Sequence, residues 1–352
     1  MRPAFLRSSP RADSRTSLNS ERANFVVFHS SRGVFLKVLI PPGKSGNVLA
    51  TIAIGDQYLE PFMKYAYHTW EMYCRRHDLG LILFDDHLIE RDHPKFKNPF
   101  WQKLLIPKVL KESGLGIKNV CHLDTDILAN PFAPSIFSGH DERKVGLISQ
   151  MKRMPYERHD VLRRVAFLRN KYLSSDYPLD SILFASIDQL FQFSDLKPQS
   201  DYACTGVFIF SPYHHADVIT EFFKEFDETV LTPDSGGEEM HFNYLIQSQK
   251  LDEWLDYRFQ AIWIYEIAWK FPFLYEEENR KNLELVKNCI LSSLFSNYFV
   301  HFAGPWHESQ LWKNIDLFKG GFEIAMFNDF FEYLKMPVTG KPKGSIKPKD
   351  NA

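Results

Sequence analysis

The sequence predicts an α/β protein whose doubly wound, mixed sheet is flanked by helices. Apolar, strand-forming runs alternate with helical patterns between about residue 47 and residue 210. Such alternation is typical of parallel strands joined by crossover helices. The chain of 352 residues is long enough to bury a sizeable core, as one large domain or as two small ones.

The elements follow one another in a regular order. The first predicted helix carries Phe62, Ala66 and Trp70 along one stripe, and Pro107 should kink the second. The expected elements are a strand at 47–54, a helix at 58–77, a strand at 81–84, a helix at 100–112, a strand from 119, a strand at 145–149, a helix at 157–172 and a strand at 202–210.

Two aspartates end the strand that starts at residue 119, in the run NVCHLDTDILAN. Residues i and i+2 of a strand lie on one face, so Asp124 and Asp126 can present two carboxylates to one point. In open α/β sheets, ligands lie at the carboxyl ends of strands. Mg²⁺ and Mn²⁺ take oxygen ligands and keep positions for phosphate. The alternative interpretation is a turn at a strand end.

The expected organisation is a single domain at 46–335, with a nucleotide-binding half at about 46–130 and an acceptor half at about 131–335. Residues 1–45 are expected to be a disordered or poorly ordered extension. Residues 336–352 mix Pro, Gly and Lys and predict a flexible basic tail.

Composition limits the class of partner. The net charge of -2, without a dense basic cluster, argues against nucleic acid. No run approaches the roughly 18 apolar residues that span a bilayer, although lysines of the tail could contact an anionic membrane weakly. The four cysteines are widely spaced, which indicates neither a zinc ribbon nor a disulfide framework. We expect a cytoplasmic protein, at most peripheral to the membrane.

Two later segments add polar groups. Thr205 and Gly206 open an apolar strand, where glycine lets a ligand approach the backbone or marks a bulge. In SGGEEMHFNYLIQ, Ser235 and Glu238 have the spacing of a capping box, which explains Glu238 as a helix cap.

Glu239 and Asn243 are i and i+4 on the same predicted helix and share a face. A carboxylate with a supporting amide suits a nucleophile, a base or a clamp on a sugar hydroxyl. A solvent-exposed glutamate in the first turn, favoured by the helix dipole, is the alternative.

His301 ends the apolar strand of YFVHFAGPWH and precedes a turn at Gly304 and Pro305. A neutral imidazole at a strand end can reach a metal ion, and the alternative is a purely structural histidine.

The sequence resembles the GT-A-fold nucleotide-sugar glycosyltransferases, most of all the retaining, glycogenin and galactosyltransferase-like group. The resemblance rests on four motifs in this order along the chain: HLDTDIL, TGVFIFSP, EEMHFNYLI and HFAGPW. The resemblance covers about residues 47–310 and implies a GT-A-like fold. It implies that Asp124, Asp126 and His301 hold Mn²⁺ or Mg²⁺ against a donor diphosphate. EEMHFN is similar to the blood-group-type transferases, which implies that Glu239 lies beneath the donor sugar.

The resemblance also implies a place for the donor nucleotide. Its base would lie on the first turn, against Ile54 and Tyr58, and uracil is the usual choice of the family. Other implied donor contacts come from Thr125, Thr205, Gly206 and Gly304. The lysine that usually follows the histidine and glycine is missing, and Lys103 or Lys313 is the expected substitute.

The predicted function is metal-dependent transfer of a sugar from a nucleotide-diphosphate donor to a hydroxyl of a saccharide or lipid-linked acceptor, in polysaccharide or glycolipid synthesis. If configuration is retained, Glu239 stabilises the oxocarbenium face or attacks it. If configuration is inverted, Asp234, Glu238 or Glu239 deprotonates the acceptor. The alternatives are a haloacid-dehalogenase-type phosphatase and a non-catalytic nucleotide-sugar binding protein.

Overall fold

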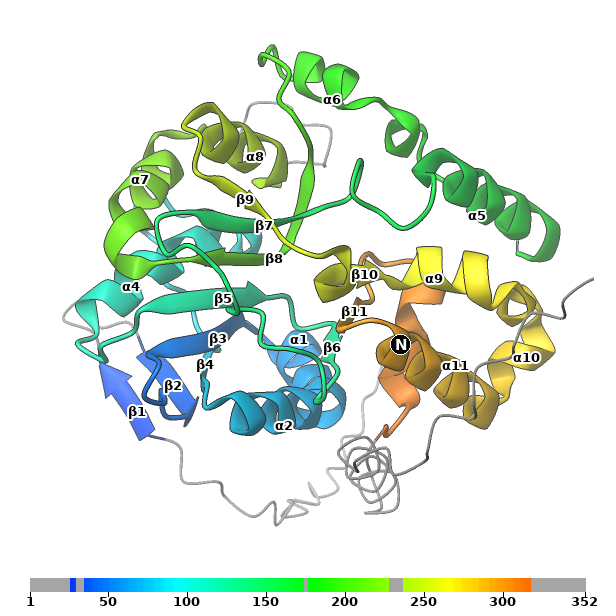
Figure 1. Ribbon diagram of the computed structural model, residues 1–352, viewed down its shortest axis with the longest axis horizontal. Helices are drawn as coiled ribbons and strands as arrows, with labels where there is room; N and C mark the ends of the chain where they lie inside the picture. The colour runs from blue at the N-terminus through cyan, green and yellow to red at the C-terminus, as the bar shows by residue number, and fades with distance from the viewer. Residues whose placement is uncertain (1–25, 30–34, 174–176, 228–236, 318–352) are drawn as a thin grey trace, which may run out of the picture.

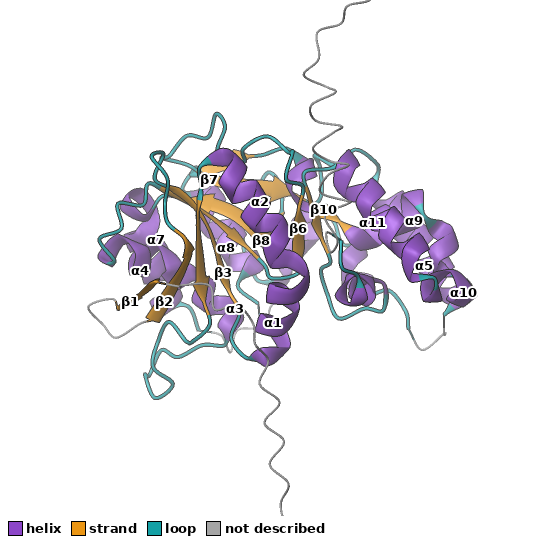
Figure 2. Cartoon of the chain, turned by 90° about the horizontal axis from the view of Figure 1, so that it is seen from below, coloured by secondary structure: helices purple, strands orange, loops and turns teal. Residues whose placement is uncertain are grey.

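The computed structural model describes residues 26–29, 35–173, 177–227 and 237–317. An eight-stranded mixed sheet has helices on both faces, and a three-stranded sheet lies beside it (Figures 1 and 2). The predicted α/β class, a mixed sheet flanked by helices, is confirmed.

The large sheet has the strand order β1-β2-β4-β3-β5-β8-β7-β9. Its strands are β1 (Val26–His29), β2 (Phe35–Ile40), β3 (Asn47–Ile52), β4 (Gly80–Phe84), β5 (Asn119–Leu123), β7 (Val145–Ser149), β8 (Ala203–Phe210) and β9 (Asp252–Trp254). The small sheet has the order β10-β11-β6, from Ala261–Ile262, Phe299–His301 and Ile127–Ala129.

The longer helices form two groups. Around the large sheet lie α1 (Asp56–Pro61), α2 (Tyr67–His77), α3 (Pro99–Gln102), α4 (Ile106–Glu112), α7 (Pro212–Glu225) and α8 (Glu239–Ser248). At the right of Figure 1 lie α5 (Arg158–Tyr172), α9 (Trp263–Lys270), α10 (Glu277–Lys281) and α11 (Leu283–Ser296), with α6 (Ile187–Phe193) above them. Short 3₁₀ turns occur at Lys103–Leu105, Ser181–Phe184, Tyr257–Gln260, Pro272–Tyr275 and Glu308–Asn314.

The central strands β4, β3 and β5 are parallel, and β8 is antiparallel to β5. Leu123 at the end of β5 therefore lies opposite Val207, in the middle of β8. This arrangement brings the turn after β5 next to Thr205 and Gly206, which the sequence places far away. The topology thus assembles the polar groups of both strands at one edge of the sheet.

Two apolar clusters cover the two faces of the sheet. On one face, Val48 and Val120 pack with Phe223 of α7. On the other face, Leu49 and Cys121 pack with α2 and α9. Neighbouring residues of one strand thus point to opposite clusters, as the pleat requires, and burial on both faces explains the continuous apolar runs of the sequence.

The predicted helix at 58–77 is interrupted. It consists of α1, a π-helical segment at Phe62–Ala66 and α2, and Pro61 lies at the junction. Proline has no backbone N–H and removes one helical hydrogen bond, so the chain rewinds there. The expected stripe is confirmed, because Phe62, Ala66 and Trp70 are completely buried.

The predicted helix at 100–112 is also broken, and the break precedes Pro107. The 3₁₀ turn Lys103–Leu105 separates α3 from α4, and Pro107 lies in the first turn of α4. Proline is tolerated at that position because the N–H that it lacks would have no helical partner.

The sheet begins before residue 46, where the domain was predicted to start. Residues 35–40 form β2, which pairs with β4 and carries the ion pair of Lys37 with Asp85. The prediction of a disordered extension up to residue 45 is therefore wrong for this strand. Residues 1–25, most of the extension, and the predicted tail at 336–352 lie outside the described residues. The division into a nucleotide-binding half and an acceptor half stays a prediction.

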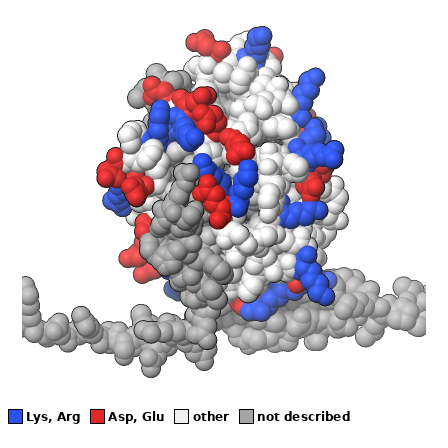
Figure 3. Space-filling view, turned by 90° about the vertical axis from the view of Figure 1, so that its left-hand side faces the viewer, with Lys and Arg blue, Asp and Glu red and all other residues white. Residues whose placement is uncertain are grey.

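All four cysteines have free thiols. Within the described ranges, no helix combines the length and the apolar character that a membrane crossing requires. On the face of the molecule that lies at the left of Figure 1, basic and acidic side chains are intermixed (Figure 3).

Candidate functional site

Asp124 and Asp126 flank the turn between β5 and β6. The Asp124 N–H donates to the Gly206 carbonyl at 2.9 Å, and the Asp126 carbonyl accepts from the Phe302 N–H at 3.0 Å. Each aspartate is thus held by a strand that comes much later in the chain. The two backbone bonds fix the turn at the carboxyl end of β5, as the D-x-D pattern predicts.

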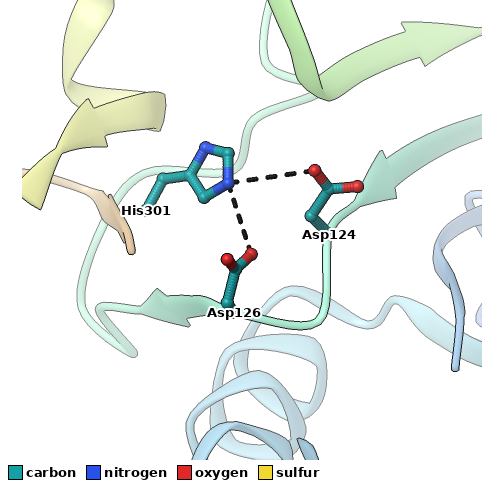
Figure 4. A group of neighbouring side chains, drawn as sticks. All are labelled: Asp124, Asp126 and His301. Carbon is teal, nitrogen blue, oxygen red and sulfur yellow. Dashed lines mark ion pairs between the residues drawn. The ribbon is translucent and has the colours of Figure 1, made fainter. Parts of the chain in front are cut away.

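His301 reaches the aspartates through strand register. In the small sheet His301 is paired with Ile127, the residue after Asp126. Its Nε2 lies 3.3 Å from Asp126 Oδ1 and 3.8 Å from Asp124 Oδ2 (Figure 4). One ligand atom from each of the three residues lies within 4.8 Å of the other two. The structure therefore brings together the three metal ligands that the sequence predicts.

Gly206 makes this cluster sterically possible. A Cβ at this position would lie 2.4 Å from His301 Cε1 and 3.0 Å from Asp124 Oδ2. The space that a side chain would fill is thus occupied by the protein itself. The expectation that this glycine admits a ligand to the backbone stays a prediction, and the close approach observed is that of the imidazole.

His122 belongs to the site although it is missing from the predicted residues. Its Nε2 lies 3.1 Å from Asp124 Oδ1, and the residue is 2% exposed. Burial lowers the pKa of His122 despite the neighbouring Asp124, so the ring is neutral and donates Nε2–H to the carboxylate. His122 lies on β5, which ends at Leu123, two residues before Asp124, and this spacing is a signal that could have identified it.

Charge interactions shift the pKa values of two predicted ligands. Burial alone would lower the pKa of His301, but the charge and hydrogen bond of Asp126, together with Cys204, hold it well above its usual value. Burial would raise the pKa of Asp124, but Lys103, His122 and His301 hold it well below its usual range. The carboxylate of Asp124 therefore stays ionised and available to a cation.

Lys103 and Glu238 form a buried ion pair close to Asp124. Lys103 Nζ lies 2.6 Å from Glu238 Oε1, and Lys103 is 6% and Glu238 2% exposed. The Thr205 hydroxyl donates to Glu238 at 2.6 Å and accepts from Lys103 at 3.2 Å. Burial would lower the pKa of Lys103, but Glu238 and Asp124 raise it, so the lysine stays charged.

The interpretation of Glu238 as a capping-box residue is wrong. Glu238 is itself the N-cap of α8, and its side chain makes no capping hydrogen bond. The Glu238 carboxylate instead forms the ion pair with Lys103 and accepts a hydrogen bond from the Thr205 hydroxyl. Ser235, the other half of the predicted box, lies outside the described residues.

Glu239 and Asn243 share one face of α8, as expected. Glu239 Oε2 accepts from the Thr205 N–H at 3.1 Å. The Asn243 amide accepts from the N–H of Ala203 and donates to its carbonyl, both at 2.8 Å. Asn243 therefore docks α8 on the backbone of β8, and Thr205 orients the carboxylate of Glu239.

A pocket of about 790 Å³ opens beside the two aspartates. The predicted residues that line it are Ile54, Tyr58, Lys103, Asp124, Thr125, Asp126 and Gly304. Residues missing from that prediction are Ile52, Gln57, Pro61, Pro99, Phe100, His122, Pro305, Gln310 and Trp312. Thr205, Gly206, Glu238, Glu239, Asn243 and His301 are not among the lining residues, and they lie behind the aspartates on β8, α8 and β11.

The last segment of the described chain closes this pocket. Gly304 adopts a φ of 87°, which favours glycine, and the turn carries Pro305 into the lining. Lys313, one of the two expected substitutes for the missing lysine, also lines the pocket. Both expected lysines therefore border the same space as the aspartates.

The three clustered residues fit a divalent cation by their chemistry. They provide two carboxylates and one imidazole, and the partly exposed Asp124 faces the pocket. Carboxylate oxygens suit Mg²⁺ and Mn²⁺, and an imidazole ligand favours the transition metal. The ligand set therefore fits a divalent cation.

No protein-family model and no curated protein matches this sequence. Solved structures similar to it include a glycosyltransferase involved in the glycosylation of the major capsid of PBCV-1, with a TM-score of 0.43 and 10% identity over 76% of this chain and 99% of that chain. The bifunctional glycosyltransferase WbbM has a TM-score of 0.41 and 13% identity, over 80% of this chain and 51% of its own. An active-site mutant of LgtC has a TM-score of 0.40 and 11% identity, over 75% of this chain and 94% of its own.

Proposed function

We propose that this protein is a metal-dependent glycosyltransferase, which moves a sugar from a nucleotide-diphosphate donor to a hydroxyl acceptor. The observation that carries the proposal is the cluster of Asp124, Asp126 and His301, in which both aspartates line the pocket. A Mn²⁺ ion held there would neutralise the charge that develops on the leaving diphosphate.

The pocket suits a nucleotide in size and in character. A volume of about 790 Å³ lies within the range of about 300–1,000 Å³ that small-molecule sites occupy. The pocket also offers apolar and aromatic surface to a base, from Ile54, Tyr58 and Phe100. We propose that the base binds these residues, at the end of the pocket far from the aspartates. Lys313 would bind the diphosphate, because the ammonium of Lys103 is already paired with Glu238. We infer a UDP-sugar as the donor from the resemblance of the motifs alone.

Glu239 is the proposed catalytic carboxylate. The Thr205 N–H orients it, whereas Glu238 is neutralised by Lys103. If configuration is retained, Glu239 stabilises or attacks the anomeric carbon. If it is inverted, Glu239 takes the proton of the acceptor hydroxyl, a role for which Asp234 also stays eligible. The acceptor is proposed to be a saccharide or a lipid-linked sugar.

The test is a screen of nucleotide sugars with and without Mn²⁺, which measures thermal stabilisation and release of nucleoside diphosphate. We expect one donor to stabilise the protein only with Mn²⁺, and release of its diphosphate to require an acceptor. Asp126→Asn should abolish both signals.

Three other outcomes would overturn the proposal. Phosphate release from a simple ester, with no requirement for a nucleotide, would indicate a phosphatase of the haloacid-dehalogenase type. Metal-dependent stabilisation without turnover against a panel of acceptors would indicate a binding protein. Absence of any shift across the panel would contradict the nucleotide site itself.

A further inference from the structure

Gln260 is a fully buried amide beside the proposed metal site. It is the last residue of the turn Tyr257–Gln260 and is 0% exposed. The next residues form β10, in which Ile262 is paired with His301. Because an amide buried without hydrogen-bond partners costs free energy, its neighbours determine how it must be oriented.

One orientation of the Gln260 amide satisfies the groups around it. With the nitrogen toward Cys204, Nε2 donates to the Cys204 carbonyl at 3.1 Å. Oε1 then accepts from the Val207 N–H at 3.3 Å and from His301 Nδ1 at 3.1 Å. In the opposite orientation the amide nitrogen faces only donors and its oxygen only acceptors. The hydrogen-bond network therefore assigns a proton to Nδ1 of His301.

This assignment decides which nitrogen of His301 is free to bind a metal. The ring can bind a metal only in its neutral form, which carries one proton, and in that form Nδ1–H leaves the lone pair on Nε2. Nε2 is the atom that faces Asp126 at 3.3 Å and Asp124 at 3.8 Å. The bond to Gln260 thus selects the tautomer in which His301 can act as a ligand together with both aspartates.

The ring is also confined on its sides. The Cβ that Gly206 lacks would lie 2.4 Å from His301 Cε1 and 2.9 Å from the atom of the Gln260 amide that faces His301 Nδ1. The amide and the imidazole therefore fill one space against β8. The same amide binds Cys204 and Val207, which flank Thr205, the residue that orients Glu239.

We propose that Gln260 is a positioning residue, which fixes the tautomer and direction of His301 and ties this ligand to the strand that orients Glu239. The inference rests on the proposed function only in requiring that a divalent cation binds at Asp124, Asp126 and His301. It does not depend on the identity of the donor or on any transfer activity.

The test compares Mn²⁺ affinity in purified full-length variants by electron paramagnetic resonance titration. Gln260→Met keeps a similar length but removes all three hydrogen bonds, and we expect Mn²⁺ affinity to fall by about 10–100-fold. Gln260→Glu keeps an acceptor for Nδ1–H and should restore affinity to within a few-fold of the wild type.

Gln247→Met is the matched control. Gln247 is 7% exposed, and its amide donates to the Asp201 carbonyl at 2.8 Å and accepts from the Asp201 N–H at 3.2 Å. The Gln247→Met variant therefore loses a buried amide comparable to that of Gln260, but at a position away from the metal ligands. We expect the Mn²⁺ affinity of this variant to stay within twofold of the wild type.

Further results separate the failure of this inference from the failure of the proposed function. If the wild type does not bind Mn²⁺, the metal site and the proposed function both fail. If the wild type binds Mn²⁺ and Gln260→Met binds it equally well, only the role of Gln260 is refuted. Equal losses in Gln260→Met and Gln247→Met would show a merely structural effect and would also refute it.

The tautomer can be observed without any variant at Gln260. In ¹⁵N-histidine-labelled protein with Zn²⁺ as a diamagnetic probe, His301 should show a protonated Nδ1 and a metal-bound Nε2, assigned by comparison with His301→Gln. A proton on Nε2 and metal on Nδ1 would overturn the proposal, even if Gln260→Met fails to fold.

Discussion

Two buried ion pairs in this protein look alike in isolation but differ in their surroundings. Arg169 and Glu308, each 1% exposed, join α5 to the turn Glu308–Asn314, with Arg169 Nε 2.7 Å from Glu308 Oε1. Lys103 and Glu238 lie beside the aspartates, with their charged atoms 2.6 Å apart. Burial and distance therefore do not distinguish them.

The Arg169 pair has matched charges. One guanidinium faces one carboxylate, and the Tyr177 hydroxyl donates to Glu308 at 3.2 Å. The guanidinium lies between two rings, with its carbon 4.6 Å from the centre of Tyr177 and 4.5 Å from that of Trp306. This pair holds the turn Glu308–Asn314, which contributes Gln310 and Lys313 to the pocket, so its role is structural.

The Lys103 pair has an excess of acid around it. Glu238 and Glu239 both accept from Thr205, and the charge of Asp124 also acts on Lys103. Asp126 lies next to Asp124 in the metal cluster. Four carboxylates thus lie near the cations of Lys103 and His301, since the ring of His122 is neutral. The two ion pairs differ in unmatched negative charge and not in burial, and the excess of acid is where the proposed cation would bind.

Removing one carboxylate from the acidic group is expected to have the largest effect, and it tests whether the excess of negative charge explains metal binding. In Asp126→Ala we expect Mn²⁺ binding to be lost and sugar transfer to slow by about 10³-fold, because several kcal/mol of charge stabilisation disappear. Calorimetric titration and a diphosphate-release assay measure both effects. Asp217→Ala removes the exposed partner of Lys111 and should change neither. Unchanged Mn²⁺ affinity in Asp126→Ala would contradict the acidic excess as the reason for metal binding.

Arg169→Met tests the matched pair. It leaves Glu308 buried without its cation, so the free energy of unfolding should fall by about 3–5 kcal/mol. Urea denaturation monitored by fluorescence measures the loss. The double change Arg169→Met with Glu308→Met should recover most of it, because no buried charge is left alone. A single variant as stable as the wild type would mean that this pair is not structural.

Glu239→Gln tests whether Glu239 acts in catalysis and not in metal binding. The amide oxygen can still accept from the Thr205 N–H, so the fold should be kept. We expect kcat to fall by about 10²-fold through loss of a catalytic carboxylate. The Mn²⁺ Kd should stay within twofold, because Glu239 is not in the metal cluster. Parallel losses of kcat and Mn²⁺ affinity would assign Glu239 to the metal instead.

The smallest expected effect concerns pH. Because the folded pKa of His301 is raised, its stabilisation is fully present below the unfolded value of about 6.5 and is lost as pH rises through the folded pKa. Between these two pKa values, the free energy of unfolding of the metal-free protein falls by up to about 1.4 kcal/mol for each unit of pH. Urea unfolding in EDTA at increasing pH measures this slope, and His301→Gln should flatten it. An equal slope in both proteins would refute the assignment to His301.

The local pattern of apolar and polar residues was sufficient to predict most helices and strands and the aspartate pair. The spacing D-x-D predicted that Asp124 and Asp126 lie close together at the end of a strand, and this depends on neighbouring residues only. The structure places both in the turn between β5 and β6, not on the strand itself. The same spacing could have identified His122. The strand at 35–40 was not predicted, and its place in the sheet is set by antiparallel pairing with β4, which lies about 40 residues later in the chain.

Glu238 shows where local rules mislead. Its spacing from Ser235 matches a capping box, but the N-terminus of α8 lies against β8 and brings Glu238 to Lys103. Lys103 is buried at this point, and leaving its charge without Glu238 would cost about 3–5 kcal/mol, which is more than the roughly 1 kcal/mol that a cap contributes. No pattern within one helix contains that information.

The sequence by itself determined the alternating strands and helices, the aspartate pair and the strand-end histidine, because periodicity and residue chemistry are local properties. Only the tertiary structure decided that β11 lies beside β6, that Gly206 leaves room for the His301 ring, and that Gln260 faces its Nδ1. These contacts depend on strand register and close packing between segments far apart in the chain, which no local pattern specifies.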